Sequence, residues 1–571
     1  MRTTRGVEVG AALAVLVACA GCTEVLGFGR FSGEGEDASA PMDGQVDLDA
    51  GGDAAADAGM DATVDERLAL TVTVNGEGTV TSDPPGVDCG ASCEGRFAPG
   101  TRVTLTATGT DTGIVSWGGD CGGFDETCVV TVDADRAVEA DFGPRGSARW
   151  VAQISFSGAD FIESDAAVTS DGHVVVAGTI DDADGTDLYV AKLDRESGAE
   201  LWATRVVTSV NEFYGGLAVD AEGNVYAAAT VLGFGDFMVG RTRLAADLSG
   251  NVMVLRLAAA DGAIAWVRDW GGGGQDRPSG LAVDGADLYV VGETSSTSAD
   301  FDGLTLSGGG SGDAFIVRAP TSTGMPARLK HLEGNLEVRA VAASGGRVGI
   351  TGDFTGSATF DPGCGINWSG AMASDGFVAD LRGSDLDCQW ANDFGSFREG
   401  ETVLGFAIAS HPDGGWVATG GFEGSVNFAG SGTSLTARDA MDAYVVRYDA
   451  GGGHVWSFRF GGTGSDLGTS IGTTPDGATL WAGAFDSAVT FGAFSLTGNR
   501  DAFVARLGPG MTPIVEWARG FGGDDPDRAE GVAVDPAGNP YVAAYFSGMT
   551  VVDGRALAAA SQDAWVAGLV R

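Results

Sequence analysis

Short apolar runs alternate with turns rich in glycine and aspartate through the C-terminal three quarters of the chain, and the pattern recurs about every 60 residues. One run has the form Asp-Ala-aromatic-Val followed by further apolar positions. Its seven copies begin at Asp187, Asn251, Asp313, Asp375, Asp442, Asp501 and Asp563. A second run is a pair of apolar segments around an Asp/Gly turn, as in GLAVDAEGNVYAAA from Gly216. Both runs predict short strands joined by tight turns.

A third run alternates a tryptophan with polar residues, as expected for a strand with one solvated face. It occurs at Trp150, Trp202, Trp266, Trp390, Trp456 and Trp517, with Arg328 in the place of the missing tryptophan. The three runs together predict four antiparallel strands per repeat.

Strands that are apolar on nearly every residue suit sheets covered on both faces by neighbouring sheets. Seven four-stranded sheets close into a ring, so we predict an all-β chain with a seven-bladed β-propeller over residues 147–571. The repeats resemble the bacterial β-propeller repeat of the SBBP type from Trp150 to Arg571. Because the last repeat stops after its third strand, the strand around Trp150 is expected to complete the last blade.

Residues 67–143 alternate Thr and Val with turn residues and predict four to five short strands. The segment resembles the divergent internalin-type B-repeat of bacterial surface proteins, through GEGTV from Gly76, GTRVTLTA from Gly100, WGG from Trp117 and AVEADF from Ala137. The resemblance implies a spacer or adhesive β module without catalytic residues.

The same segment holds four cysteines, which are Cys89, Cys93, Cys121 and Cys128. They lack the paired C-x-x-C knuckles of a zinc site, so two disulfides are favoured over zinc. Pairing Cys89 with Cys93 and Cys121 with Cys128 closes two short loops, although four cysteines allow three connectivities. In the fourth repeat, a disulfide between Cys364 and Cys388 is possible, but the connections that carry them are expected on opposite faces of a blade.

Residues 1–22 have the layout of a secretory signal, with Arg2 and Arg5 before an apolar run. The run ends in Cys19-Ala20-Gly21-Cys22, which resembles the lipoprotein box whose cysteine receives the lipid. Cys22 is preferred because an even number of cysteines then remains, with Cys19 as the alternative and an ordinary signal peptide as the third interpretation. Residues 23–66 are acidic, without a basic residue after position 30, and predict a disordered tether.

The chain carries 78 acidic and 33 basic residues, a formal net charge of −45 that disfavours nucleic acid as a partner. No catalytic signature such as G-x-S-x-G, a P-loop or H-E-x-x-H occurs. Four histidines, His173, His331, His411 and His454, fall in turns or outer strands and are interpreted as solvated. The motif from Asp194 to Trp202 is similar to the tryptophan-docking repeat of quinoprotein propellers, and is interpreted as packing one blade against the next.

An acid follows the apolar end of each tryptophan strand at the fifth or sixth position. These acids are Asp160, Glu212, Asp276, Glu337, Glu399, Asp466 and Asp527. The simpler interpretation is that each carboxylate accepts backbone N–H bonds in its own glycine-rich turn. The alternative is a ring of negative potential at a channel mouth that favours calcium or a cationic ligand. No other cofactor is expected.

We therefore expect an exported monomer of the cell envelope, anchored in the outer membrane by its lipid and facing the periplasm or the cell surface. It would bind a glycan, peptide or protein partner through the propeller face and would not be an enzyme. The alternatives are a propeller enzyme of the polysaccharide lyase, glycosidase or quinoprotein type and an envelope-assembly scaffold. Two carboxylates about 5 to 10 Å apart in one pocket would favour a glycosidase.

Overall fold

The computed structural model describes residues 66–571, except 90–91, 157–159, 184, 247–248, 308–311, 362–363, 365, 396–399 and 429–433. The predicted signal, both candidate lipid-bearing cysteines and all but the last residue of the acidic tether lie outside the described residues. The described part is all-β, and no helix in it is long and apolar enough to cross a membrane.

The first folded segment consists of two four-stranded sheets around one apolar core. One sheet has the order β4-β1-β8-β6 and the other β3-β2-β5-β7. The strands are β1 (Leu68–Asn75), β2 (Thr79–Asp83), β3 (Asp88–Cys89), β4 (Ser92–Phe97), β5 (Thr101–Thr108), β6 (Thr112–Gly119), β7 (Thr127–Val132) and β8 (Arg136–Pro144). Buried residues alternate with more exposed ones along β1 and β7, so Val72 and Val74 of one sheet and Val130 and Val132 of the other face the core, whereas Val129 is 47% exposed.

Within the described residues after position 147, the strands pair in antiparallel sheets of two to eight strands, and the seven sequence repeats divide these strands into seven units. The first three units consist of β10 (Asp160–Val168), β11 (Val174–Asp182), β12 (Gly185–Leu193) and β13 (Glu200–Val206); β14 (Asn211–Val219), β15 (Val225–Leu232), β18 (Asn251–Leu257) and β19 (Ile264–Gly272); and β20 (Asp276–Asp284), β21 (Asp287–Thr294), β24 (Asp313–Pro320) and the beginning of β25 (Arg328–Ser344).

The other four units follow in the same way. They consist of the remainder of β25, β26 (Arg347–Asp361), β27 (Ile366–Arg382) and β28 (Cys388–Phe394); β29 (Val403–Ser410), β30 (Trp416–Phe422), β33 (Asp442–Tyr448) and β34 (His454–Phe460); β35 (Leu467–Thr473), β36 (Thr479–Phe491), β37 (Phe494–Leu507) and β38 (Val515–Gly523); and β39 (Asp527–Val534), β40 (Pro540–Val552), β41 (Arg555–Leu569) and β9 (Ala148–Ile154).

Hairpins extend the second and third strands of several units. Separate strand pairs form these hairpins in three units: β16 (Gly235–Val239) with β17 (Thr242–Ala246), β22 (Ser298–Phe301) with β23 (Leu304–Ser307), and β31 (Ser425–Asn427) with β32 (Ser434–Thr436). In the fourth, sixth and seventh units the extension is continuous with the long strands themselves.

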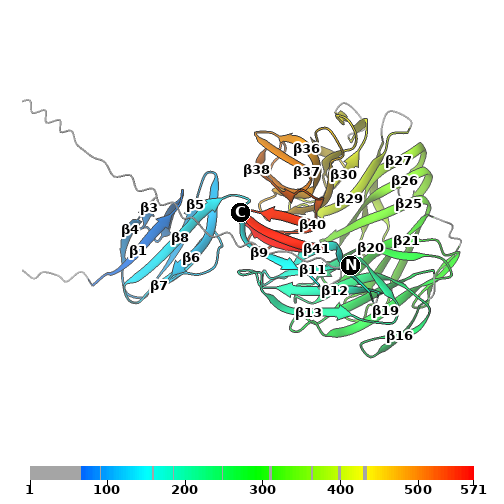
Figure 1. Cartoon of the computed structure of the whole chain (residues 1–571), viewed down its shortest axis with the longest axis horizontal. Helices are drawn as coiled ribbons and strands as arrows, with labels where there is room; N and C mark the ends of the chain where they lie inside the picture. The colour runs from blue at the N-terminus through cyan, green and yellow to red at the C-terminus, as the bar shows by residue number, and fades with distance from the viewer. Residues whose placement is uncertain are drawn as a thin grey trace, which may run out of the picture. The chain divides into compact units, whose positions relative to one another are not determined.

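The units pack in a cyclic order. Seven clusters of buried apolar residues each join two consecutive units within the described residues, and one of them joins the last unit to the first. In that cluster Trp150 of β9 and Tyr541 of β40 pack with Phe161 of β10 and Tyr189 of β12. As the sequence predicts, β9 pairs with β41, and the two lie side by side in Figure 1. Such packing of twisted antiparallel sheets is that of a β-propeller.

Tryptophans of the fourth strands dock on glycines of the next unit. Trp150 lies against Gly198, which has a φ of +71°, and donates from Nε1 to the Arg195 carbonyl at 2.9 Å. A Cβ at Gly198 would come within 2.5 Å of the Trp150 ring, so both the backbone and the contact require glycine. Trp202 and Gly262 repeat the arrangement. The motif that resembles the tryptophan-docking repeat therefore packs one unit against the next, as interpreted from the sequence.

Three disulfides are present in the described residues. Cys89 pairs with Cys93 and Cys121 with Cys128, which are the favoured pairings. Cys364 also pairs with Cys388, with Cα atoms 5.5 Å apart, so the expectation that opposite faces separate them is wrong. The register shifts on both sides of Gly356, which has a φ of +77°, mark a bend in the β26–β27 hairpin. We attribute the contact to this bend, since it can return the tip of the hairpin to the beginning of β28.

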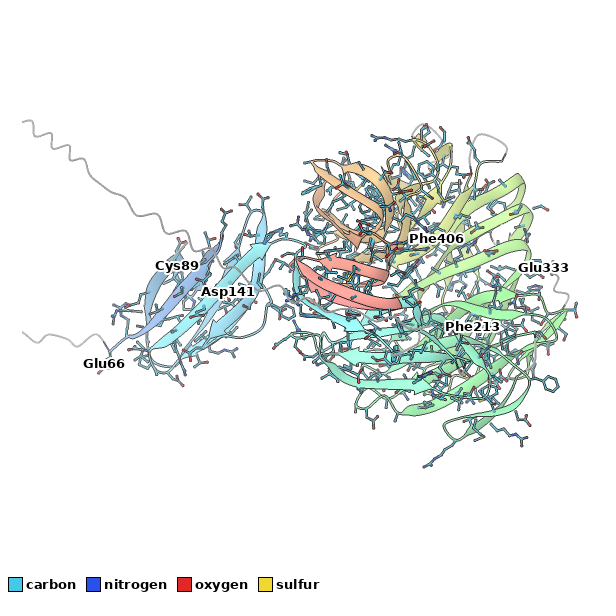
Figure 2. All side chains as sticks on the ribbon, viewed as in Figure 1. Glu66, Cys89, Asp141, Phe213, Glu333 and Phe406 are labelled. Atoms are coloured by element: carbon cyan, nitrogen blue, oxygen red, sulfur yellow. A yellow bond between two sulfur atoms is a disulfide. The ribbon has the colours of Figure 1, made fainter. Side chains whose placement is uncertain are left out.

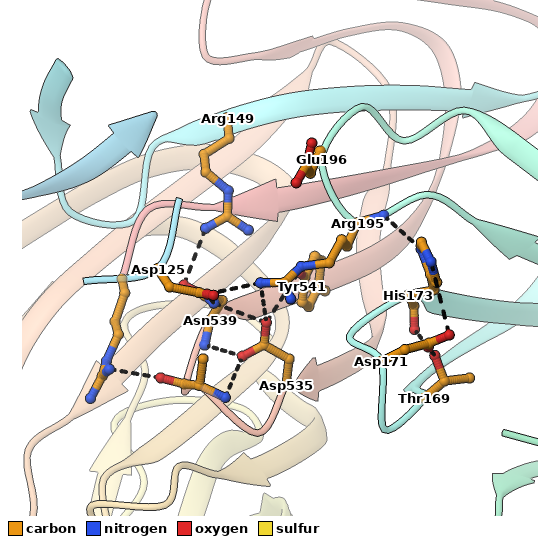
Figure 3. A network of polar contacts seen from close by, with 12 residues as sticks. Asp125, Arg149, Thr169, Asp171, His173, Arg195, Glu196, Asp535, Asn539 and Tyr541 are labelled. Carbon is orange, nitrogen blue, oxygen red and sulfur yellow. Dashed lines mark hydrogen bonds and ion pairs between the residues drawn. The ribbon is translucent and has the colours of Figure 1, made fainter. Parts of the chain in front are cut away.

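The loop between β6 and β7 meets turns of the first and last units (Figure 3). Arg195 and Asn539 both donate to the Asp125 carboxylate, at 2.8 and 2.9 Å. Phe124 is 4% exposed, and the Arg149 guanidinium lies 3.6 Å from the centre of its ring. Burial lowers the pKa of Arg149 to about 10, the main cost of placing this cation against the ring.

Candidate functional site

Every unit has an irregularity at the same place in its first strand. A register shift interrupts the pairing of the first and second strands in all seven units of the described residues, for example between Tyr214 and Gly216, Pro278 and Gly280, and Gly405 and Ala407. Such a bulge bends the strand and changes the direction of its side chains. The first strands therefore depart from regular antiparallel pairing at a similar position in each unit.

A cavity lies at the beginning of three of these first strands. It has a volume of about 600 Å³, within the range of small-molecule sites, and its walls come from β14, β15, β20, β21 and β25. We call it the first-strand pocket and define it by Phe213, Tyr214, Arg277, Glu293, Glu337 and Arg339. Figure 2 labels Phe213 on the first strand of the second unit.

Apolar and aromatic side chains form one part of the first-strand pocket. Phe213, Tyr214 and Leu232 line it and are half-buried, and Pro278 lines it and is buried. Tyr214 is held in place because its hydroxyl donates to Asp165 of the first unit at 2.9 Å. One of the two aromatic rings of the pocket is therefore fixed by a contact between two units.

Charged pairs form the other part of the pocket. Arg277 Nη2 lies 2.6 Å from Glu293 Oε2, and Arg339 pairs with both Glu337 and Asp353. Burial raises the pKa of Glu337, and the neighbouring Arg339 partly offsets this effect. Arg339 also lies over the ring of Phe406, at 5.7 Å from its centre. Both cations of the pocket are thus neutralised by nearby carboxylates.

Most predicted ring acids do not line this pocket. Asp276, Asp466 and Asp527 are buried and accept N–H bonds from Gly272, Gly462 and Gly523, four residues earlier in each case. This is the simpler interpretation of the sequence, a carboxylate that closes its own turn. Burial raises the pKa of Asp466 to about 6 and that of Asp527 to about 7.

The remaining ring acids differ from one another. Glu212 is fully buried and accepts from the Thr208 hydroxyl, whereas Glu337 lines the pocket and its side chain is 41% exposed. Asp160 begins β10, but nothing is described of its side chain, and Glu399 lies outside the described residues. No group of three or more potential metal ligands occurs among the residues that the structure describes. Calcium binding by the ring stays a prediction.

The histidines occupy the predicted turns and strands, but one interpretation fails. His411 is buried at 6% exposure, and its Nε2 lies 3.1 Å from the Gly477 carbonyl of the next unit. Burial lowers its pKa, so it is a neutral packing residue and not a solvated one. It lines another cavity, of about 350 Å³, among the turns between first and second strands.

Sequence reasoning missed Phe213, Arg277, Glu293 and Arg339. A usable signal existed, because Phe213 and Arg277 directly follow predicted ring acids and so begin the same first strands. Glu293 and Arg339 gave no such signal. The proximity of Glu293 and Arg339 to Phe213 and Arg277 depends on which units are neighbours.

Comparisons with known proteins identify no family. No family model and no curated protein matches the chain. Among solved structures, the chain is similar to the Dos1 propeller (10% identity, TM-score 0.35, covering 74% of this chain and 95% of that one). It is also similar to the quinohemoprotein alcohol dehydrogenase of Comamonas testosteroni (10%, 0.35, 81% and 77%) and to Chaetomium thermophilum Sqt1 bound to the N-terminus of ribosomal protein L10 (10%, 0.35, 75% and 100%). At these values the similarities carry no argument about function.

Proposed function

We propose that this chain is an exported, lipid-anchored binding protein whose seven-bladed propeller holds a ligand in the first-strand pocket. The observation that carries the proposal is the pocket itself, which combines an aromatic wall with paired charges at the beginning of three first strands. Concave, largely preformed sites with a few converging polar groups are the usual form of ligand pockets. A glycan, a peptide or another envelope component is the proposed class of partner.

The accessory parts of the proposal rest on the sequence. Cys22 would carry the lipid, residues 23–66 would act as a tether, and the B-repeat-like module would serve as a spacer. The cyclic packing of seven units, in which β9 pairs with β41, supports a closed ring of seven blades.

A glycosidase is the second candidate, because Glu293 and Glu337 line the same pocket. A glycosidase needs one carboxyl group with a raised pKa and a second that stays ionised. Burial raises the pKa of Glu337, while Glu293 is paired with Arg277. Release of reducing ends from an oligosaccharide, abolished by Glu337→Gln and by Glu293→Gln, would establish this activity in place of simple binding.

Obstruction of the pocket tests the binding function. Gln275 lines the pocket and is exposed, so Gln275→Trp should fill it at little cost to folding. Full-length wild type is expected to bind members of combined glycan and peptide arrays, and Gln275→Trp is expected to lose that binding. Ser495→Trp, at an exposed position of β37, is the control and should bind as wild type does. Equal binding by wild type and Gln275→Trp would refute the proposal.

A further inference from the structure

We infer that the first-strand pocket takes a neutral, hydroxyl-rich ligand, namely a sugar unit of an uncharged glycan. This inference rests on the proposed function and names its ligand class. Three features of the pocket support it: the balance of its charges, the surplus of hydrogen-bonding groups on its ion pairs, and its aromatic wall.

The charges of the pocket disfavour an ionic ligand. Arg277 is paired with Glu293, and Arg339 is paired with Glu337 and with Asp353, which is 4% exposed. Two guanidinium groups therefore face three carboxylates. An anion would meet a local excess of negative charge in a chain of net charge −45, and a cation would have to compete with arginines already in place. A neutral ligand avoids both costs.

Ion pairs of this kind suit hydroxyl groups. A guanidinium group has five N–H donors and a carboxylate has about four acceptor sites, so a pair leaves both kinds available to a ligand. A sugar hydroxyl donates and accepts at once, and can therefore bridge Arg277 and Glu293. Hydrogen bonds to charged groups are stronger than those between neutral groups, which offsets the desolvation of a polar ligand.

The aromatic wall completes the match. Phe213 and Tyr214 lie on β14, whereas the charged residues that line the pocket lie on β20, β21 and β25. An aromatic ring has a negative face that attracts the weakly positive C–H groups of a sugar ring. One face of the ligand would thus rest on carbon while its hydroxyls reach the ion pairs.

The bulges argue against a peptide as the ligand. A peptide that binds by strand addition needs a regular edge, where successive backbone groups remain in register. β14 and β20 are edge strands, and the pocket-lining part of β25 pairs only with β26, but each has a register shift within or directly beside the residues that line the pocket. Bulges interrupt pairing at sheet edges, so an extended peptide would lose consecutive backbone hydrogen bonds here.

Binding of full-length protein to an array of neutral hexose and N-acetylhexosamine oligomers tests the inference, with sulfated and uronic acid glycans and peptides on the same surface. The variants are Phe213→Ala and Arg277→Ala. Their control is Arg528→Ala, because Arg528 follows the buried Asp527 in β39 as Arg277 follows Asp276 in β20, yet does not line the pocket.

We expect wild type to bind at least one neutral glycan, with affinity reduced about tenfold or more in Phe213→Ala and Arg277→Ala and within about twofold of wild type in Arg528→Ala. Preference for charged glycans or for peptides, with the same dependence on Arg277, would overturn the inference and leave the proposed function standing. No binding to any neutral glycan would also overturn it. Glycan binding that all three variants retain would place the site elsewhere and would refute both.

Discussion

Glu212 provides a sharp test of how burial controls the electrostatics of the first strands. It belongs to β14 and is fully buried. Its Oε1 accepts from the Thr208 hydroxyl, while none of the described residues donates a hydrogen bond to Oε2. Burial raises the pKa of Glu212 from 4.5 to about 8, and the carboxylate of Asp187 acts in the same direction. We therefore predict that Glu212→Gln, a neutral replacement of nearly equal shape, stabilises the protein at alkaline pH.

The sign and size of the effect of Glu212→Gln on the unfolding free energy follow from proton linkage. The folded state keeps the Glu212 proton up to about pH 8, whereas the unfolded chain loses it near 4.5. The contribution of Glu212 to the unfolding free energy is therefore greatest below about pH 4.5 and is lost as the pH rises through 8. Each pH unit between these two pKa values lowers the unfolding free energy by about 1.4 kcal/mol. The full destabilisation by Glu212 is therefore at most about 5 kcal/mol. Glu212→Gln should remove this cost.

Urea unfolding at pH 4.5 and pH 8.5 measures the effect. The variant is expected to match wild type within about 1 kcal/mol at pH 4.5 and to exceed it by several kcal/mol at pH 8.5. Glu222→Gln, in the exposed turn after β14, is the control and should change neither value. A difference between Glu212→Gln and wild type that is the same at both pH values would refute the reasoning.

Three further predictions concern the anchor, the ring and the contact with the β6–β7 loop. Cys22→Ser is expected to release the protein from membranes, because the lipid is the proposed anchor, and unchanged fractionation would contradict this. Deletion of residues 147–158 should lower the melting temperature far more than deletion of 31–60, since it removes β9 from its pairing with β41; equal melting temperatures would argue against closure by this strand. Phe124→Ala should lower the unfolding free energy by about 3 to 5 kcal/mol, because it removes a buried ring from beneath Arg149, and a loss under about 1 kcal/mol in urea unfolding would show that the contact contributes little.

The local sequence pattern was sufficient to predict the strands and their repetition along the chain. The apolar runs, the Asp/Gly turns and the tryptophan strands depend on the residues nearest in sequence, so they predicted the antiparallel strands of each repeat. The pairing of β9 with β41 was predicted from the expected ring closure. The two disulfides of the first segment were also predictable, since each closes a loop of only a few residues.

Tertiary structure decided the features that depend on contacts between distant segments. The β26–β27 hairpin has register shifts that no periodicity in the sequence reveals, and Cys364 at its tip pairs with Cys388. Sequence marked Glu212 and Glu337 as equivalent, yet one is fully buried and the other lines a pocket, because burial is set by the hairpins and units that cover each position. The pocket itself combines residues of three units, including Phe213, Arg277 and Arg339. The hydrophobic pattern therefore determined the repeated strands. The charge and exposure of the pocket residues were decided only by packing, which removed some polar groups from water and left others exposed.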